Sequence, residues 1–178
     1  MQNNSLNNVL LTPHFSLLEM TESRTAKKNG IDNTPPPEVV ENLKALCLGT
    51  LEPLREALQM PVVITNGFRC QRLNEILLHS ARKSQHLSGC AADFYVGWAA
   101  ALNGKGKSGD APSPRKRLVK AFRLIILNEA IDYDQLIIYP TFIHVSYVSR
   151  DKNRHSIMEA KGNGKYRSLT KADALSLT

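Results

Sequence analysis

The sequence SQHLSGCAAD, at residues 84–93, holds two side chains of kinds that commonly bind metals. The imidazole of His86 lies seven residues before the carboxylate of Asp93, and Gly89 and small residues stand between them. Neutral imidazole and ionised carboxylate suit zinc, and a catalytic zinc usually takes three protein ligands and leaves a fourth position for water. The stretch therefore predicts two ligands of a metal site and requires a third from elsewhere in the chain.

The best candidate for the third ligand is His144, in the segment FIHVSY. Apolar and polar residues alternate there, which predicts a half-buried strand that carries the imidazole to one face. The segment CAADFYV predicts a second strand, in which an unpaired Asp93 would be costly to bury, and a bound metal removes that cost. Taken singly, His86 could instead bond to a backbone group, and Asp93 could cap a helix or form a salt bridge.

The rest of the chain predicts a single α+β domain with a small mixed or antiparallel sheet and flanking helices. Apolar residues at three- and four-residue intervals indicate helices, whereas β-branched runs and alternating patterns indicate strands. The expected helices are a short one capped by Ser16, one from Pro37 to Leu58 that Pro53 kinks or divides, one at 70–80 and one at 115–128. The expected strands lie at 61–65, 90–96, 135–139 and 142–147, with an edge strand at 155–160.

Composition changes along the chain predict where the domain begins and ends. The Asn-rich residues 1–13 are expected to form a flexible lead, and residues 14–161 the domain itself. Residues 25–37 contain three consecutive prolines and predict an extended loop, while residues 103–114 are rich in Gly, Ser, Pro and Lys and predict a mobile surface loop. The polar residues 162–178 are expected to be a tail.

The chain has 178 residues, a hydrophobic fraction of 42% and a net charge of +7, which fit one globular domain with an anionic partner. Basic and aromatic residues do not interleave along any segment, so we expect no nucleic-acid partner. The sequence begins without a basic segment followed by a long apolar stretch, and no segment reaches the roughly 20 apolar residues that span a bilayer. We therefore expect no membrane segment and no signal peptide. We also expect the protein to be a monomer.

The motif at residues 84–93 resembles a specific family of peptidases. The residues that match its pattern SxHxxGxAxD are Ser84, His86, Gly89, Ala91 and Asp93. This is the pattern of the zinc D-Ala-D-Ala carboxypeptidase family, peptidase M15, which includes phage L-Ala-D-Glu endopeptidases. The resemblance covers roughly residues 15 to 160. Over this range the chain is similar to the peptidoglycan-directed branch of the family, its subfamily A. It implies a DD-peptidase/hedgehog-like fold.

The resemblance also implies roles for individual residues. One Zn²⁺ ion would be bound by His86, Asp93 and His144. Arg69 matches an arginine near the site that can stabilise a substrate carboxylate or a developing oxyanion, a role that suits its fixed fork of donors. Ser84 and Gln85 match positions that line the site, where they could hold the peptide backbone.

The sequence departs from the family pattern at the catalytic acid. The family places a Glu or Asp a few residues before its final histidine, but the segment QLIIYPTFI before His144 contains no acid. Tyr139 or Thr141 occupies the position where the acid is expected. The remaining candidates for the general base are Asp134, Asp132 and Glu159.

Three functions follow from these observations. The first is a zinc peptidase that hydrolyses peptidoglycan stem peptides at a bond involving a D-amino acid, as a carboxypeptidase or an endopeptidase. The second is a catalytically weak or inactive zinc-binding domain of the same fold that binds peptidoglycan or a protein partner. The third, a basic nucleic-acid module with a structural zinc, has only the net charge in its favour. A peptidase of this kind acts on the cell wall or in the periplasm, so without a signal peptide the chain is expected to be phage- or prophage-encoded and released, or otherwise cytoplasmic.

Overall fold

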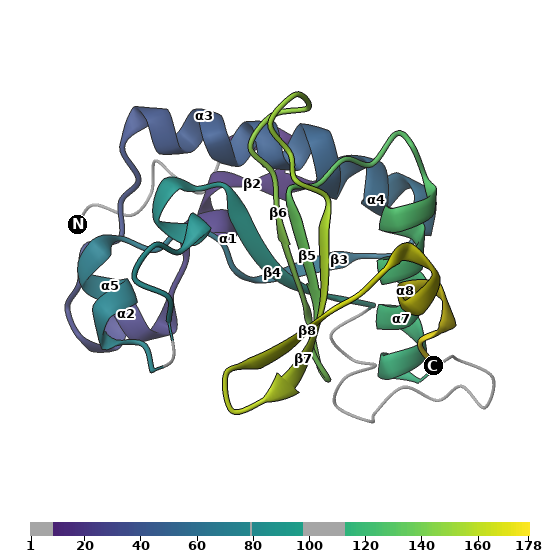
Figure 1. Cartoon of the computed structure of the whole chain (residues 1–178). Coiled ribbons are helices and arrows are strands. Elements are labelled where there is room, and N and C mark those ends of the chain that lie inside the picture. Colours follow the sequence, from purple (N-terminus) through teal and green to yellow (C-terminus); the bar gives the residue numbers. More distant parts are fainter. Residues whose placement is uncertain (1–8, 79, 98–112) are drawn as a thin grey trace.

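The computed structural model describes residues 9–78, 80–97 and 113–178 of the chain. A six-stranded sheet in the order β3-β4-β6-β5-β7-β8 runs through the middle of the molecule, and α3, α4 and α7 pack against it (Figure 1). Strands β5 and β7 are parallel, and the other neighbours in this sheet are antiparallel. A mixed sheet flanked by helices confirms the predicted α+β class.

The elements follow one another along the chain in nearly the predicted order. The strands are β1 (Leu10–Thr12), β2 (Phe15–Ser16), β3 (Val62–Asn66), β4 (Ala91–Val96), β5 (Gln135–Ile138), β6 (Ile143–Ser146), β7 (Ser156–Gly162) and β8 (Lys165–Ser168). The α-helices are α1 (Leu17–Thr21), α2 (Arg24–Lys28), α3 (Pro37–Leu46), α4 (Glu52–Leu58), α5 (Gln71–Ile76), α7 (Pro114–Leu127) and α8 (Lys171–Ser176). A π-helical turn, η2 (Cys47–Leu51), joins α3 to α4, and a 3-10 turn, η3 (Gln85–Ser88), precedes β4.

Alternation along the central strands separates a core face of the sheet from a site face. On β4, Ala92, Phe94 and Val96 are buried in the main apolar core. Asp93 points to the opposite face, where it pairs in register with His144 on β6. The sheet therefore places the two predicted strand ligands next to each other on its site face.

The long helix predicted from Pro37 is divided, as expected, just before Pro53. Because proline has no N–H, Pro53 leaves the carbonyl of Gly49, four residues earlier, without its helical donor. The chain widens into η2 at this point, and the backbone N–H of Asp132 donates to the Gly49 oxygen at 2.9 Å. The interruption thus connects the helical layer to the segment that leads into β5.

Two predictions near the N-terminal half need correction. The expected loop at 25–37 contains part of α2, because Ser23 caps a short helix by accepting from the backbone N–H of Ala26. The helix expected at 70–80 ends at Ile76. Both errors concern short helices with little apolar periodicity, where capping and tertiary contacts determine the length.

The predicted domain limits are also too narrow. Residues 10–12, expected in the flexible lead, form β1 and pair with β2. The expected polar tail contains β8 and α8, and Ala174 of α8 is fully buried in the core. As a result β7, predicted to be an edge strand, lies between β5 and β8, and β8 forms the edge of the sheet. The hairpin turn between them carries Gly162 and Gly164, both with positive φ.

Residues 1–8 of the expected lead and residues 103–112 of the expected surface loop lie outside the described residues. Ser113 caps α7, and Pro114 begins it. No helix in the described ranges combines the length and apolar character required to cross a membrane.

Candidate metal centre

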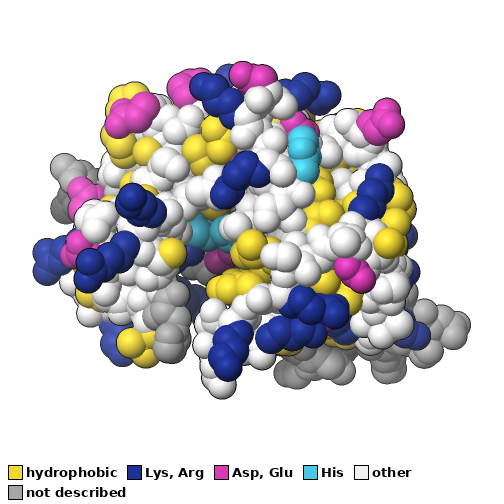
Figure 2. All heavy atoms as spheres, in the orientation of Figure 1, with side chains coloured by type: hydrophobic (Ala, Val, Ile, Leu, Met, Phe, Trp, Pro, Cys, Tyr) yellow, Lys and Arg dark blue, Asp and Glu magenta, His cyan; other side chains and the backbone are white. Residues whose placement is uncertain are grey.

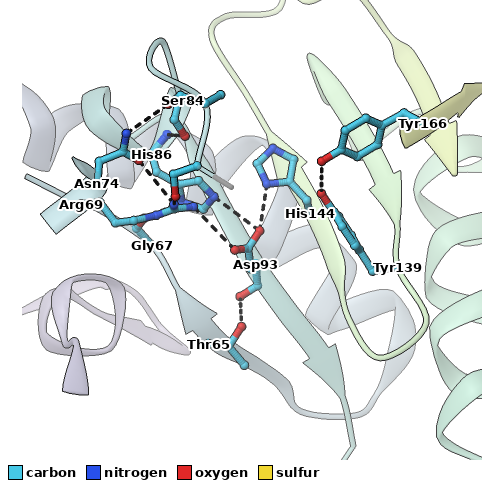
Figure 3. Close-up of polar contacts among 12 residues, drawn as sticks. Thr65, Gly67, Arg69, Asn74, Ser84, His86, Asp93, Tyr139, His144 and Tyr166 are labelled. Atoms are coloured by element: carbon cyan, nitrogen blue, oxygen red, sulfur yellow. Dashed lines mark hydrogen bonds and ion pairs between the residues drawn. The ribbon is translucent and has the colours of Figure 1, made fainter. Parts of the chain in front are cut away.

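The three predicted ligands meet at one point of the site face. His86 comes from η3, Asp93 from β4 and His144 from β6 (Figure 3). One ligand atom from each lies within 4.8 Å of the others. His144 Nδ1 is 2.8 Å and His86 Nε2 is 3.4 Å from the same oxygen, Asp93 Oδ1. The structure therefore brings together the predicted set of two imidazoles and one carboxylate.

The motif residues around His86 explain how the short η3 turn forms. Ser84 is its N-cap, and its Oγ accepts from the backbone N–H of His86 at 3.4 Å. Gly89 ends the turn in the left-handed region, with φ of 72°. A Cβ at Gly89 would lie 2.8 Å from Val39 on α3, so only glycine allows this turn to sit close to the helix. The spacing of Ser84, His86 and Gly89 is thus a requirement of local backbone geometry.

The protonation state of His86 favours a bound cation. Its Nδ1 lies 2.6 Å from the carbonyl oxygen of Gly67, and because a carbonyl can only accept, Nδ1 carries the proton. Burial also lowers the pKa of His86, which favours the neutral ring. Nε2 then presents a lone pair toward Asp93 Oδ1, yet it is buried and has no hydrogen-bond partner among the described residues. A cation between these two acceptors would satisfy both.

Asp93 supplies the negative charge of the cluster. Burial alone would raise the pKa of this carboxyl group, but the adjacent His86 and His144 together hold it well below its ordinary value. Asp93 is therefore ionised at neutral pH. Two imidazole nitrogens and one carboxylate oxygen form a donor set that suits zinc. On this test the residues present fit a zinc ion.

Arg69 lies beside the cluster, as the sequence suggested. Its Nη2 is 3.8 Å from Asp93 Oδ2, and its Nη1 donates to Asn74 at 3.4 Å and to Ser80 at 3.0 Å. The backbone N–H of Arg69 also donates to the carbonyl of His86 at 3.1 Å. Its Nε is buried without a partner in the described part of the chain. The guanidinium is thus fixed in place and keeps one N–H donor unused.

The cluster opens into a pocket of about 670 Å³. The predicted substrate-binding residues Ser84 and Gln85 line this pocket together with Arg69, and so does Asp134. Figure 2 shows a hollow in which histidine and acidic side chains are visible, with Lys and Arg side chains around its mouth. The three candidate metal ligands therefore face a pocket that is open to solvent on one side.

Asp134, the nearest candidate for the general base, is held in another role. It is buried and accepts from Arg154 Nε at 2.8 Å, from the backbone N–H of Arg154 at 3.0 Å and from Gln85 Nε2 at 2.9 Å. These bonds, foremost those of Arg154, lower the pKa of Asp134 to about 2, so it accepts a proton poorly at neutral pH. Asp134 instead connects the loop that carries His86 to the loop that carries Arg154. Its role as the base stays a prediction, and these contacts favour the connecting role instead.

The other two candidate bases do not face the pocket. Glu159 pairs with Ile138 in the sheet and therefore points to the core side, where it forms ion pairs with Lys161 and Arg167 at 2.8 Å each. Asp132 is bonded to His155 Nε2 at 2.7 Å and does not line the pocket. Strand alternation and loop contacts thus turn both carboxylates away from the three candidate metal ligands.

Tyr139, in the segment before His144 that contains no acid, lies at the site. Its hydroxyl is 3.0 Å from that of Tyr166 on β8, and both rings line the pocket (Figure 3). Burial raises the pKa of Tyr139, so its hydroxyl remains a neutral donor. Ala160 of β7 pairs with Tyr166 in the sheet. Sequence analysis missed Tyr166, although the GNG turn before KYRS is a hairpin signal.

Replacing Asp134 with asparagine is expected to destabilise the protein by about 1–3 kcal/mol at pH 7, because bonds to a charged acceptor are lost. The pKa of Asp134 is lower in the folded chain than its ordinary value near 3.9, so its contribution is present above about pH 4 and lost as the pH falls toward 2. Urea unfolding at several pH values should show the two proteins converging in acid. A constant difference across that range would contradict the assigned role.

The sequence profile described as Peptidase M15 matches residues 13–102, just over half of the chain. The matched range contains Arg69, His86 and Asp93, whereas His144 lies beyond it and joins the cluster through the pairing of β6 with β4. No curated protein matches the chain. Members of the matched family are generally zinc-dependent, in agreement with the donor set described above. The chain belongs to the peptidase M15 family.

Proposed function

We propose that this protein is a zinc peptidase that hydrolyses peptidoglycan stem peptides at a bond involving a D-amino acid, as a carboxypeptidase or an endopeptidase. The observation that carries the proposal is the unsatisfied Nε2 of His86, which faces Asp93 Oδ1 and His144 Nδ1 at the base of an open pocket. A catalytic zinc site requires three protein ligands and an open side for water and substrate. The proposed place of action is the cell wall.

In this proposal His86, Asp93 and His144 hold one zinc ion. When bound, the ion would supply a water of lowered pKa and polarise the scissile carbonyl. The guanidinium of Arg69 lines the pocket, where its charge would hold a substrate carboxylate or a developing oxyanion. The Tyr139 hydroxyl is a second donor, neutral in charge, on the side of His144 opposite Arg69 (Figure 3). These donors orient the peptide and favour the charged transition state.

A second candidate function is a catalytically weak or inactive zinc-binding domain that binds peptidoglycan or a protein partner. The observation in its favour is that the carboxylates lining the pocket among the described residues are Asp93 and Asp134. Asp93 faces the metal position, and Asp134 is engaged by Arg154. General base catalysis is typically worth about 10²- to 10⁴-fold in rate, so a site without a free carboxylate would be slow.

One experiment separates the two functions. Zinc-loaded protein is incubated with purified peptidoglycan and with synthetic stem peptides, and the products are identified by mass spectrometry. Release of peptide or D-alanine by the parent and none by His86→Ala supports the peptidase. If the parent carries one zinc per chain and releases no product, the binding function replaces the proposed one.

Zinc is also expected to raise the melting temperature. A ligand that binds only the folded state at 100 times its Kd stabilises by about 2.7 kcal/mol, which corresponds to roughly 5–10 °C for a chain of this size. The measurement compares thermal unfolding of chelator-treated protein with that of zinc-loaded protein, with Mg²⁺ as the control ion. Identical melting curves in chelator and in zinc would contradict the metal site.

A further inference from the structure

The pocket beside the three candidate metal ligands has more basic than acidic side chains in its lining. It is lined by four cationic side chains, Arg69, Lys83, Lys152 and Arg154, against two acids, Asp93 and Asp134. Arg154 is paired with Asp134 at 2.5 Å, and Arg69 lies 3.8 Å from Asp93. The remaining charges are those of Lys83 and Lys152.

Both of these lysines are exposed at the mouth of the pocket. Within residues 9–78, 80–97 and 113–178, neither makes an ion pair or a side-chain hydrogen bond. The basic side chains visible around the hollow in Figure 2 agree with this excess of positive charge. A zinc ion in the cluster would add to it. The pocket is therefore electrostatically incomplete without an anionic ligand.

The two lysines belong to separate loops, but a shared set of contacts holds these loops together. Lys83 directly precedes Ser84, the N-cap of η3. Lys152 lies in a turn, where its own backbone N–H donates to the carbonyl of Ser149 at 3.0 Å. Gln85, next to the first loop, and Arg154, next to the second, both bond to Asp134. This connection fixes where the two lysine backbones lie relative to the pocket.

We propose that Lys83 and Lys152 bind a free carboxylate of the substrate that is not part of the scissile bond, so that the pocket selects acidic stem peptides. The inference rests on the proposed function and adds a substrate preference to it. A D-glutamate linked through its side chain leaves its α-carboxylate free, whereas D-isoglutamine carries an uncharged amide of the same shape at that position. The protein thus distinguishes stems that contain D-glutamate from those that contain D-isoglutamine.

The test measures binding of two peptides to chelator-treated protein by calorimetry. One peptide is L-Ala-γ-D-Glu-L-Lys-D-Ala-D-Ala, and the other differs only in D-isoglutamine at the second position. Exposed ion pairs are individually weak, so the acidic peptide should bind about four- to twentyfold more tightly to the parent at low salt. The preference should shrink in 0.5 M salt, where the Debye length falls to about 4 Å.

Matched variants assign this preference to the two lysines. Lys83→Met with Lys152→Met should remove it, while Lys83→Arg with Lys152→Arg should retain it because the charge is kept. The control is Lys116→Met with Lys120→Met, which changes the net charge equally but alters two exposed lysines of α7 outside this pocket. Equal binding of both peptides by the parent, binding of neither, or a preference that survives the first pair of substitutions would overturn the inference.

The outcome also remains separate from that of the proposed function. Hydrolysis of both peptides by the zinc-loaded parent with the same kcat/KM would support the peptidase and exclude the carboxylate preference. Tighter binding of the acidic peptide without hydrolysis would support the preference and contradict the peptidase. Because binding is measured without zinc, it does not depend on turnover.

Discussion

His86→Ala protein is expected to lose its bound zinc and, with it, all detectable hydrolysis of peptidoglycan peptides. The substitution removes one of three ligands, so the loss of zinc affinity should exceed the 10- to 100-fold that follows loss of a supporting residue around a metal. It also leaves the buried carbonyl of Gly67 without its hydrogen bond, which costs about 1–3 kcal/mol. Zinc titration, product analysis and denaturant unfolding test the three effects separately.

A second variant keeps the prediction testable if His86→Ala folds poorly. Asp93→Asn preserves the shape of the side chain and removes only the negative charge that faces the metal position. It should fold and bind zinc far more weakly than the parent. The control is His155→Asn, which alters a histidine bonded to Asp132 outside the pocket and keeps a residue type that tolerates its φ of 52°. Full zinc occupancy in both His86→Ala and Asp93→Asn would place the ion elsewhere.

Gly67→Ala is expected to damage both the fold and the metal site, although residue 67 contributes no ligand. A Cβ at this position would lie 2.2 Å from the carbonyl oxygen of Met20, which is backbone and cannot rotate away. That oxygen accepts from the N–H of Phe68 at 2.7 Å, so the two segments cannot separate without breaking the bond. Overpacking of this kind costs about 1–3 kcal/mol or more.

The substitution should also affect the metal site, because the backbone around Gly67 positions His86. Its carbonyl accepts from His86 Nδ1, and the next residue but one is Arg69, whose N–H donates to the His86 carbonyl. A shift of this segment therefore moves His86, and zinc affinity should fall by about 10- to 100-fold. Denaturant unfolding and zinc titration measure the two effects. Gly164→Ala serves as control for the metal site: its positive φ makes alanine strained, so the fold should weaken, but the added Cβ meets nothing within 4 Å and zinc affinity should not change.

Local sequence determined most of the elements and the position of each ligand within them. Alternation in CAADFYV and FIHVSY predicted the two strands and the faces on which Asp93 and His144 lie, because the side-chain period of a strand is two. The sequence placed His86 between Ser84 and Gly89 in a stretch of small residues, but only the structure shows that Ser84 caps a turn there and that Gly89 ends it in the left-handed region. Short or polar elements such as α2, β8 and α8 were missed, since tertiary contacts rather than apolar periodicity stabilise them.

The sequence by itself thus determined an α+β domain with two histidines and an aspartate as candidate ligands. Only the tertiary structure decided which other groups share the pocket with them. Pairing of β4 with β6 joined Asp93 to His144, and the contacts of Asp134 with Arg154 and Gln85 connected two loops at the pocket. Such partners are distant along the chain, and their contacts depend on sheet order and loop packing, which no local pattern records.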